Sequence, residues 1–476
     1  MVMGEQTLET QVAVIGGGPG GYAAAFRAAD LGMEVALINQ EERLGGVCLR
    51  RGCIPTKALL DVAHVIENGI KARQWGVLFS DLGIQLDKIR DHKAGVVEQL
   101  VSGLEKMAQA REVEVITGRA VFESSDIVRI EGKSDFARVK FQHAILASGS
   151  SPMALPGVEF KSGGRIMSSA QALDLEEIPE KLLVVGAGYI GLEMGTTYAA
   201  LGSQVTLVEM EDDILPGVQR TLVRPLRKRI EETFSALHFG TTVGKLKEEE
   251  DQVMVKVQGE NGGEELNFDR VLVAIGRKPN SQNMGLENTS VVIDDRGFIK
   301  VNQQQRTDDD RIYAVGDVVG GMLLAHKAIY EGKIAADVVA GEPAAFDARA
   351  IPAVIYTDPQ IAYAGLMAEE AREQGYDVDV ARFPWSASGR ATARDARSGL
   401  TMLVIEKQTD RILGIGVVGS GAEDLIAEGV LAIEMGAVAE DLALTIHAHP
   451  TLSETVGEAA EAYLGLATHI LPRKRG

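Results

Sequence analysis

One pattern occurs twice in this chain, and it limits the possible folds more than any other feature. In residues 11–39, and again in residues 181–209, a short apolar strand leads into a glycine-rich turn, a helix of small residues and a second strand. Each turn has the form G-x-G-x-x-G, with Gly16, Gly18 and Gly21 in the first copy and Gly186, Gly188 and Gly191 in the second, a constant separation of 170 residues. The duplication predicts two strand–helix–strand units and therefore an α/β fold.

The three glycines of each copy have separate physical roles. The first permits a tight turn, the second lets the backbone approach a pyrophosphate, and the third lets the helix pack closely on the strand. The helix N-terminus then presents N–H groups and a positive dipole to the phosphates. A single motif of this kind is also compatible with an incidental turn. Two copies in the same context predict two bound dinucleotides, one FAD and one exchangeable nicotinamide.

The residue at the end of each second strand indicates which dinucleotide binds. Glu209 stands there in the second copy, where an acid accepts hydrogen bonds from the adenosine ribose, and no Arg adjoins it to bind a 2′-phosphate. This favours NAD over NADP. Asn39 stands at the matching position of the first copy, where a neutral side chain still accepts a ribose hydrogen bond, so we expect somewhat weaker FAD adenosine binding. Asp317 ends a later strand in "RIYAVGDV" and is predicted to accept from the flavin ribityl chain; a plain strand-to-turn Asp is the alternative.

Both cysteines of the chain lie in "GGVCLRRGCIPTKALL", as Cys48 and Cys53. In a regular helix these positions are about 8–9 Å apart at Cα, beyond the ~7 Å that a disulfide spans. A bridge therefore needs a distorted turn, which Gly52 permits. Pro55 suits the first turn of a following helix, which places Cys53 next to a helix N-terminus that stabilises a thiolate. Redox exchange is the favoured interpretation; two unrelated buried thiols are the alternative, and no zinc site is expected.

Composition excludes several classes of partner. The 476 residues are enough for about three domains. The net charge of −20 disfavours nucleic acid and anionic membranes. No apolar run approaches the ~18 residues of a membrane span, and the first ten residues lack a signal-peptide pattern. We expect a cytoplasmic enzyme.

Near the C-terminus, "HAHPTLSE" carries His449 five residues before Glu454. A His oriented by a carboxylate can deprotonate an incoming thiol. The same residues also suit a turn His followed by a helix N-terminal Glu. The residues alone leave both interpretations open.

The cysteine segment, the two glycine motifs and their order resemble the pyridine nucleotide–disulfide oxidoreductases over essentially the whole chain. The resemblance implies an α/β fold with two Rossmann-like dinucleotide-binding domains, for FAD and NAD, and a C-terminal α+β dimerisation domain. The implied boundaries are 1–150 and 280–349 for the FAD domain, 151–279 for the NAD domain and 350–476 for the dimerisation domain.

The resemblance also implies roles for individual residues. Cys48 exchanges with a substrate dithiol, and Cys53 lies against the flavin as the charge-transfer thiolate. Lys57 approaches the flavin and pairs with Glu193. His449 and Glu454 act at the active site of the partner subunit, which requires a homodimer. The implied FAD contacts are Gly16, Gly18, Gly21, Asn39, Gly46, Val47, Lys57, Gly118, Ser148, Gly149, Asp317, Ala325 and His326, and the NAD contacts are Gly186, Gly188, Tyr189, Gly191, Glu209, Val243 and Gly276.

Within that family the chain is most similar to the members that oxidise protein-bound dihydrolipoamide to lipoamide and reduce NAD⁺. The implied partner is then a lipoyl-domain protein of a 2-oxo acid dehydrogenase or glycine-cleavage complex. A related NAD(P)H-dependent disulfide reductase and a non-catalytic flavin-binding subunit are the alternatives. Arg50 and Arg51 depart from the neutral pair usual between the cysteines. They are expected either to favour thiolates and an anionic disulfide or simply to face solvent.

Overall fold

The computed structural model describes residues 6–79, 83–260 and 262–471. Its first glycine pattern forms the centre of a mainly parallel sheet, in which β1 (Thr7–Ile15) pairs with β2 (Val35–Asn39) and with β6 (Arg138–Leu146). All five residues of β2 are buried, as expected for a strand covered on both faces. The strand order is β3-β2-β1-β6-β5-β4, with β3 Glu114–Thr117, β4 Arg119–Ser124, β5 Ile127–Glu131 and β17 (Ile312–Ala314) beside β6.

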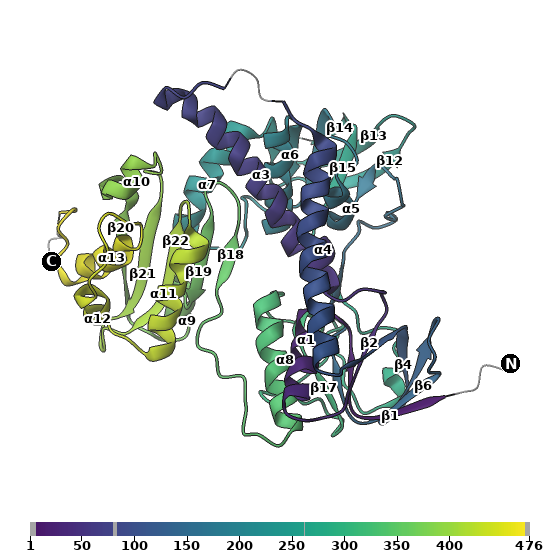
Figure 1. Ribbon diagram of the computed structural model, residues 1–476. Coiled ribbons are helices and arrows are strands. Elements are labelled where there is room, and N and C mark those ends of the chain that lie inside the picture. Colours follow the sequence, from purple (N-terminus) through teal and green to yellow (C-terminus); the bar gives the residue numbers. More distant parts are fainter. Residues whose placement is uncertain (1–5, 80–82, 261, 472–476) are drawn as a thin grey trace.

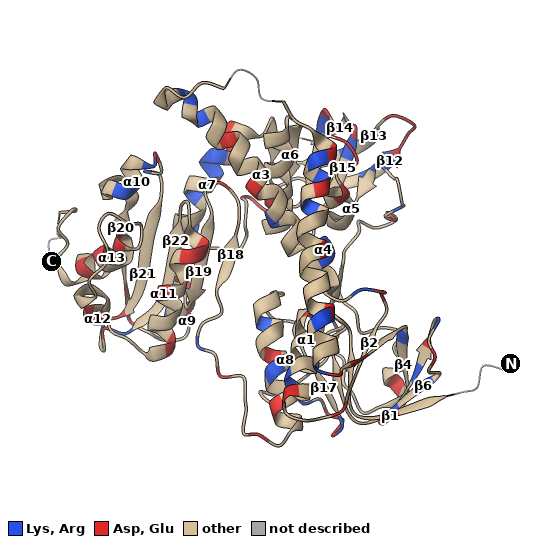
Figure 2. Ribbon diagram, in the orientation of Figure 1, with Lys and Arg blue, Asp and Glu red and all other residues tan. Residues whose placement is uncertain are grey.

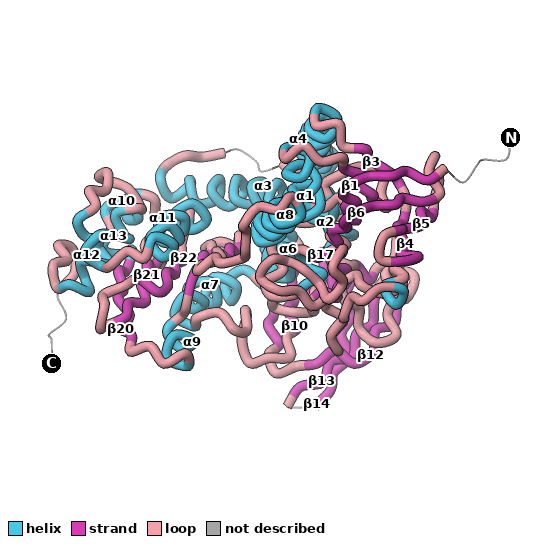
Figure 3. The backbone as a smooth tube through the Cα atoms, turned by 90° about the horizontal axis from the view of Figure 1, so that it is seen from below, coloured by secondary structure: helices cyan, strands magenta, loops and turns pink. Residues whose placement is uncertain are grey.

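The helices of this first unit carry the segments that the sequence singled out. They are α1 Pro19–Asp30, α2 Gly46–Arg51, α3 Cys53–Ala72, α4 Leu86–Ala110 and α8 Ala325–Val339, with short 3₁₀ turns η1 Arg73–Trp75, η2 Leu286–Asn288 and η3 Gly316–Val319. In Figure 1 and Figure 3, α1 and α8 lie side by side against the sheet. The chain therefore returns to its first sheet after the second unit is complete.

The second glycine pattern builds a second parallel sheet of order β11-β10-β9-β15-β8. Its strands are β8 Ile166–Met167, β9 Lys181–Val185, β10 Gln204–Val208, β11 Ala236–His238 and β15 Arg270–Val273, with helices α5 Ser169–Asp174, α6 Tyr189–Leu201 and α7 Arg220–Thr233. An antiparallel sheet of β12 (Thr242–Glu248), β13 (Val253–Gly259) and β14 (Gly262–Phe268) adjoins it. The structure thus confirms two α/β units of the predicted kind.

Two short antiparallel strands connect the units. β7 (Ser150–Pro152) pairs with β16 (Arg277–Pro279) where the chain leaves the first unit and returns to it. The exact domain boundaries stay predictions.

The C-terminal part has a different architecture. Its sheet is antiparallel, in the order β18-β19-β22-β21-β20. The strands are β18 Ala353–Ile355, β19 Ile361–Gly365, β20 Val378–Pro384, β21 Leu400–Glu406 and β22 Ile412–Val418; the helices are α9 Ala368–Glu373, η4 Trp385–Ala387, α10 Gly389–Ala393, α11 Ala422–Met435, α12 Ala439–Leu444 and α13 Glu454–Leu464. This is the predicted α+β domain.

One hydrophobic cluster joins the three parts. It buries Leu59 of α3, Leu192 of α6 and Met402 of β21. Helix α3, which begins at Cys53, is therefore fixed from several sides by apolar burial.

The distribution of charged residues and the hydropathy of the helices agree with what the composition predicts. Both signs of charge occur along α3 and α4 in Figure 2. Within the described ranges, no helix is long and apolar enough to cross a membrane.

Candidate active site

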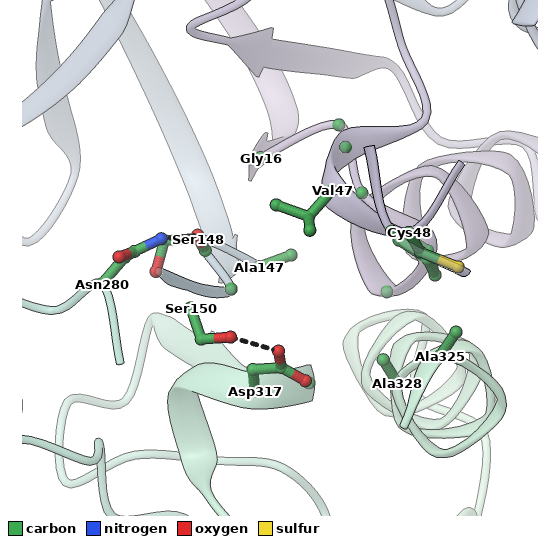
Figure 4. Close-up of a pocket in the computed structure, with 18 of the residues that line it drawn as sticks. Gly16, Val47, Cys48, Ala147, Ser148, Ser150, Asn280, Asp317, Ala325 and Ala328 are labelled. Carbon is green, nitrogen blue, oxygen red and sulfur yellow. Dashed lines mark hydrogen bonds between the residues drawn. The ribbon is translucent and has the colours of Figure 1, made fainter. Parts of the chain in front are cut away.

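A cavity of about 480 Å³ lies where the first unit meets α6. Its wall includes the first glycine turn, the end of β2, α2, the start of α3, the segment 147–150, the turn at Asp317 and the start of α8. Figure 4 shows Val47 and Cys48 on one side and the Ser150–Asp317 hydrogen bond on another. Its volume falls in the range typical of cofactor pockets.

The glycine turns have nearly the same geometry in both copies. Gly16 has φ +112°, and a Cβ there would lie 2.3 Å from the Ala147 carbonyl oxygen. Gly186 has φ +102°, and its Cβ would lie 2.6 Å from the Ala274 oxygen. A Cβ at the third glycine of the first motif, Gly21, would lie 1.7 Å from the Gly16 oxygen. Only glycine fits these positions, which explains the repeated motif.

Asn39 occupies the place of the acid that the second copy has. Its Oδ1 accepts from Gly17 N at 3.1 Å, as Glu209 Oε2 accepts from Ala187 N at 2.6 Å. Its Nδ2 donates to the carbonyl oxygens of Glu41 at 2.7 Å and Arg43 at 2.9 Å. The amide therefore keeps the acceptor function and also ties down the following loop. One lone pair of Oδ1 remains for a ribose hydroxyl.

The cysteines face the cavity from two helices that meet at a break. Between α2 and α3, Gly52 has φ −146° and ψ −113°. This is the distorted turn predicted from the spacing, although Cys53 begins the helix instead of preceding it. Both cysteines are free thiols, Cys48 half-buried and Cys53 exposed, and both line the cavity.

The two thiols differ in acidity. A hydrogen bond from Cys48 and the charge of Lys57 lower the pKa of Cys53 to about 7, although Cys53 is partly desolvated because the surface it exposes faces the cavity, which acts in the opposite direction. The same hydrogen bond and burial raise the pKa of Cys48. These directions favour Cys53 as the thiolate of the pair, and that assignment stays a prediction.

This difference predicts how the reduced protein reacts with an alkylating reagent. The reaction of Cys53 should rise with pH through about 7, because its folded pKa is depressed and the reactive thiolate is lost as pH falls through that value. Lys57→Met should move the midpoint upward by about one pH unit, since an opposite charge is removed. Alkylation followed by mass spectrometry compares the midpoint of Cys48→Ser with that of Cys48→Ser/Lys57→Met, because both variants lack the Cys48 hydrogen bond and differ only in Lys57. An unmoved midpoint would show that Lys57 does not act on the thiolate.

Lys57 belongs to a contact between three parts of the chain. Its Nζ lies 2.8 Å from Glu193 Oε2, and Glu193 is 2% exposed. Glu193 Oε1 accepts from Tyr356 N at 3.0 Å, and Lys57 Nζ lies 4.3 Å from the centre of the Tyr356 ring. The predicted Lys57–Glu193 pair is present. The contact of Tyr356 with both residues had no signal in the sequence.

Arg50 and Arg51 both pair with Glu41. Arg51 lines the cavity together with Glu41. The cation acting on Cys53 is Lys57, so the pairing favours a structural role for the two arginines over thiolate activation. In the alkylation experiment, Arg51→Met should not change the pH at which Cys53 reacts at half its maximal rate.

His449 lies in the third domain, between α12 and α13, and is not part of the wall of the cavity that Cys48 and Cys53 line. Its Nδ1 is 2.7 Å from Glu454 Oε1, and the ring is 72% exposed. Burial would raise the pKa of Glu454, but the Thr451 N–H and the His449 ring outweigh it and lower that pKa. Glu454 also begins α13. The contact between His449 and Glu454 and the helix start at Glu454 are both present, and the catalytic role of the two residues stays a prediction.

The remaining predicted site residues form two groups, those that line the cavity and those that do not. Those at the cavity are Gly46, Val47, Gly118, Ser148, Gly149, Tyr189, Asp317 and Ala325. His326 is not in the cavity wall; its Nε2 lies 2.8 Å from the Pro352 oxygen, and Ala328 lines the cavity instead. Val243 lies in β12 and Gly276 before β16. These assignments stay predictions.

Three further residues at the cavity were missed. Ser150 donates to Asp317 Oδ2 at 2.5 Å, and Arg277 donates to Ser150 Oγ at 2.7 Å. Asn280 Nδ2 donates to the Ser148 oxygen at 2.9 Å. Ser150 and Arg277 begin β7 and β16, and Asn280 follows β16, but their contacts join residues more than 100 positions apart.

The cavity has the features that a flavin dinucleotide requires. Among the described residues, Ser148 Oγ is buried without a hydrogen-bond partner at the cavity wall. The glycine turn leaves room for a pyrophosphate, and Asp317 and Asn39 offer acceptors at separate points. The residues present therefore fit FAD.

These features define a dinucleotide-dependent dithiol–disulfide enzyme, and comparison with known proteins gives its class. The family of pyridine nucleotide-disulphide oxidoreductases matches residues 10–332, and the dimerisation domain of that family matches residues 351–460. The chain belongs to this family. The dimerisation domain supports a homodimer.

The most similar relatives carry one name. The chain is 46% identical over 464 residues to the dihydrolipoyl dehydrogenase of Haemophilus influenzae, with 97% of each chain covered. It is 44% identical to that of Haloferax volcanii, covering 99% of this chain and 100% of the relative. Among solved structures, LpdA from Mycobacterium tuberculosis matches with a TM-score of 0.88 and 25% identity, over 95% of this chain and 99% of that one.

Proposed function

We propose that the protein oxidises protein-bound dihydrolipoamide to lipoamide and reduces NAD⁺ to NADH, as a homodimer with one FAD per chain. The observation that carries the proposal is the unequal pair Cys48–Cys53 at the wall of the cavity, with Lys57 and Glu193 beside it. The names of the relatives at 44–46% identity support the same reaction.

The chain's own residues supply the thiol chemistry. His449 of the partner subunit, oriented by Glu454, takes a proton from one thiol of the substrate. The resulting thiolate attacks Cys48 of the oxidised pair, the bond between Cys48 and Cys53 breaks, and Cys53 leaves as the thiolate. The second substrate thiol displaces Cys48 and closes the lipoamide disulfide. One dithiol is oxidised and the Cys48–Cys53 disulfide is reduced.

When bound, FAD supplies a two-electron acceptor that reoxidises the cysteine pair and passes a hydride to NAD⁺. Around it, Lys57 and Cys53 provide a cation and a thiolate at the same part of the wall, and Glu193 holds Lys57 in place. Tyr189, at the start of α6, stands at the side of the cavity nearest the second unit.

Glu209 predicts the choice of nicotinamide. Its Oε2 accepts from Ala187 N and its Oε1 from Glu211 N at 3.0 Å, so the carboxylate is held at the end of β10. A 2′-phosphate would meet this charge at a cost of several kcal/mol. We expect kcat/KM for NADP⁺ to be at least about 100-fold below that for NAD⁺, and Glu209→Gln to narrow the ratio. Equal rates with both cofactors would contradict the proposal.

The direct test uses the purified homodimer with dihydrolipoamide and NAD⁺, followed by NADH absorbance. Turnover is the expected result. A yellow protein that forms no NADH would instead indicate a non-catalytic flavin-binding subunit. The lipoyl-bearing complex as partner, and the cytoplasmic location, stay predictions.

A further inference from the structure

The turn that carries Asp317 is short and bounded by two glycines in the left-handed region. Gly316 has φ +78° and Gly320 has φ +81°. Between them η3 (Gly316–Val319) presents the Asp317 carboxylate to the cavity, where Ser150 contacts it. Because glycines permit many conformations, something other than the local sequence must hold this turn.

Two buried charged residues of α8 hold both ends of the turn. Glu331 Oε2 accepts from Gly316 N at 2.8 Å, and Lys327 Nζ donates to the Gly320 oxygen at 3.0 Å. The two side chains pair with each other at 2.6 Å and are only 8% and 5% exposed. Lys327 and Glu331 thus bridge the two glycines that bound η3.

The position of α8 is itself fixed against the glycine motif. A Cβ at Gly332 would lie 2.4 Å from the Gly20 oxygen and 3.2 Å from Ala24 N, so the backbones of α8 and α1 touch. Figures 1 and 3 show the two helices side by side. The Lys327–Glu331 pair therefore connects the Asp317 turn to the helix that begins at the phosphate-binding turn.

Stability alone does not explain this pair. Burial raises the pKa of Glu331, which shows that its charge is costly where it lies. Replacing a buried ion pair by apolar residues is often neutral or stabilising. A costly pair that contacts both ends of one functional turn fits a positioning role better.

We propose that Lys327 and Glu331 are positioning residues that hold the Asp317 carboxylate where it can bind the ribityl chain of FAD. The proposal rests on FAD binding at this cavity. It predicts that the two residues act on cofactor affinity only through Asp317.

The test is the rate of FAD release from the holoenzyme, followed by the gain in flavin fluorescence. In Glu331→Gln, a single side-chain oxygen must serve both the Gly316 N–H and Lys327 Nζ. This variant should release FAD about 10- to 100-fold faster than the native protein. Asp317→Asn should do the same, and the double variant should release FAD no faster than Asp317→Asn alone, because the position of a missing carboxylate is irrelevant. Multiplying effects would overturn the proposal.

A matched control separates positioning from general stability. Asp337 of α8 pairs with Arg27 of α1 at 2.5 Å, so Asp337→Asn removes an ion pair of α8 that does not contact the Asp317 turn. Its FAD release should match the native rate. Equal release from the Asp337 and Glu331 variants would overturn the proposal.

A second variant covers the case in which Glu331→Gln does not fold. The apolar replacement Lys327→Met with Glu331→Leu should fold and still release FAD faster than the native protein. Native release from this variant would overturn the proposal while leaving FAD binding intact, whereas a native protein that holds no FAD would overturn the proposed function.

Discussion

Cys48→Ser should abolish the oxidation of dihydrolipoamide by NAD⁺, with a loss of at least about 1,000-fold in kcat. The proposed reaction assigns exchange with the substrate to Cys48, because Cys53 is the thiol of the pair whose pKa is lowered beside Lys57. Transfer of electrons from NADH to an artificial dye should persist, because that path needs the flavin but not the disulfide. Both rates are measured on the same preparation.

Cys53→Ser provides the comparison for this result. It should abolish dithiol oxidation as well, but it also removes the thiolate beside Lys57. Only Cys48→Ser should keep the Cys53 thiol beside Lys57, and with it a thiol whose pKa that cation lowers. Loss of the dye reaction in Cys48→Ser, with FAD still bound, would contradict the proposal that electrons pass from NADH to the flavin without the disulfide.

His449→Ala should lower dithiol oxidation about 100- to 10,000-fold, the usual contribution of a general base. The ring is exposed and paired with Glu454 at 2.7 Å, while the cysteines lie in another domain of the same chain. FAD content and the dye reaction should not change. Glu454→Gln should lower the rate less, because the His remains.

Mixed dimers test whether the base comes from the partner subunit. A dimer of one Cys48→Ser chain and one His449→Ala chain has one site with both residues intact. Random mixing of the two inactive variants should therefore restore about one quarter of the native activity. No recovery would show that Cys48 and His449 act within one chain.

Much of this site could be predicted because its constraints are local. The glycines at 16 and 186 follow from contacts with backbone a few Å away, and the break at Gly52 follows from cysteine spacing. Such local requirements restrict the residue types at fixed spacings, and the resulting pattern can be recognised in the sequence. The duplicated motif indicated both α/β units for the same reason.

The rest depends on contacts between distant segments. Nothing in the sequence indicates that Glu41 pairs with Arg50 and Arg51, or that Tyr356 contacts Lys57. His326 was placed at the cofactor by analogy, but its ring contacts the Pro352 oxygen, because successive helix residues point in different directions. Local patterns carry no information on such pairings.

The most direct test of the proposed reaction is a comparison of steady-state rates with dihydrolipoamide and NAD⁺ against glutathione disulfide and NADPH. Glu209 disfavours NADPH, and the proposed reaction therefore predicts kcat/KM at least about 100-fold higher for the first pair of substrates. A higher rate with glutathione disulfide and NADPH would contradict it and assign the chain to another reaction of the same family.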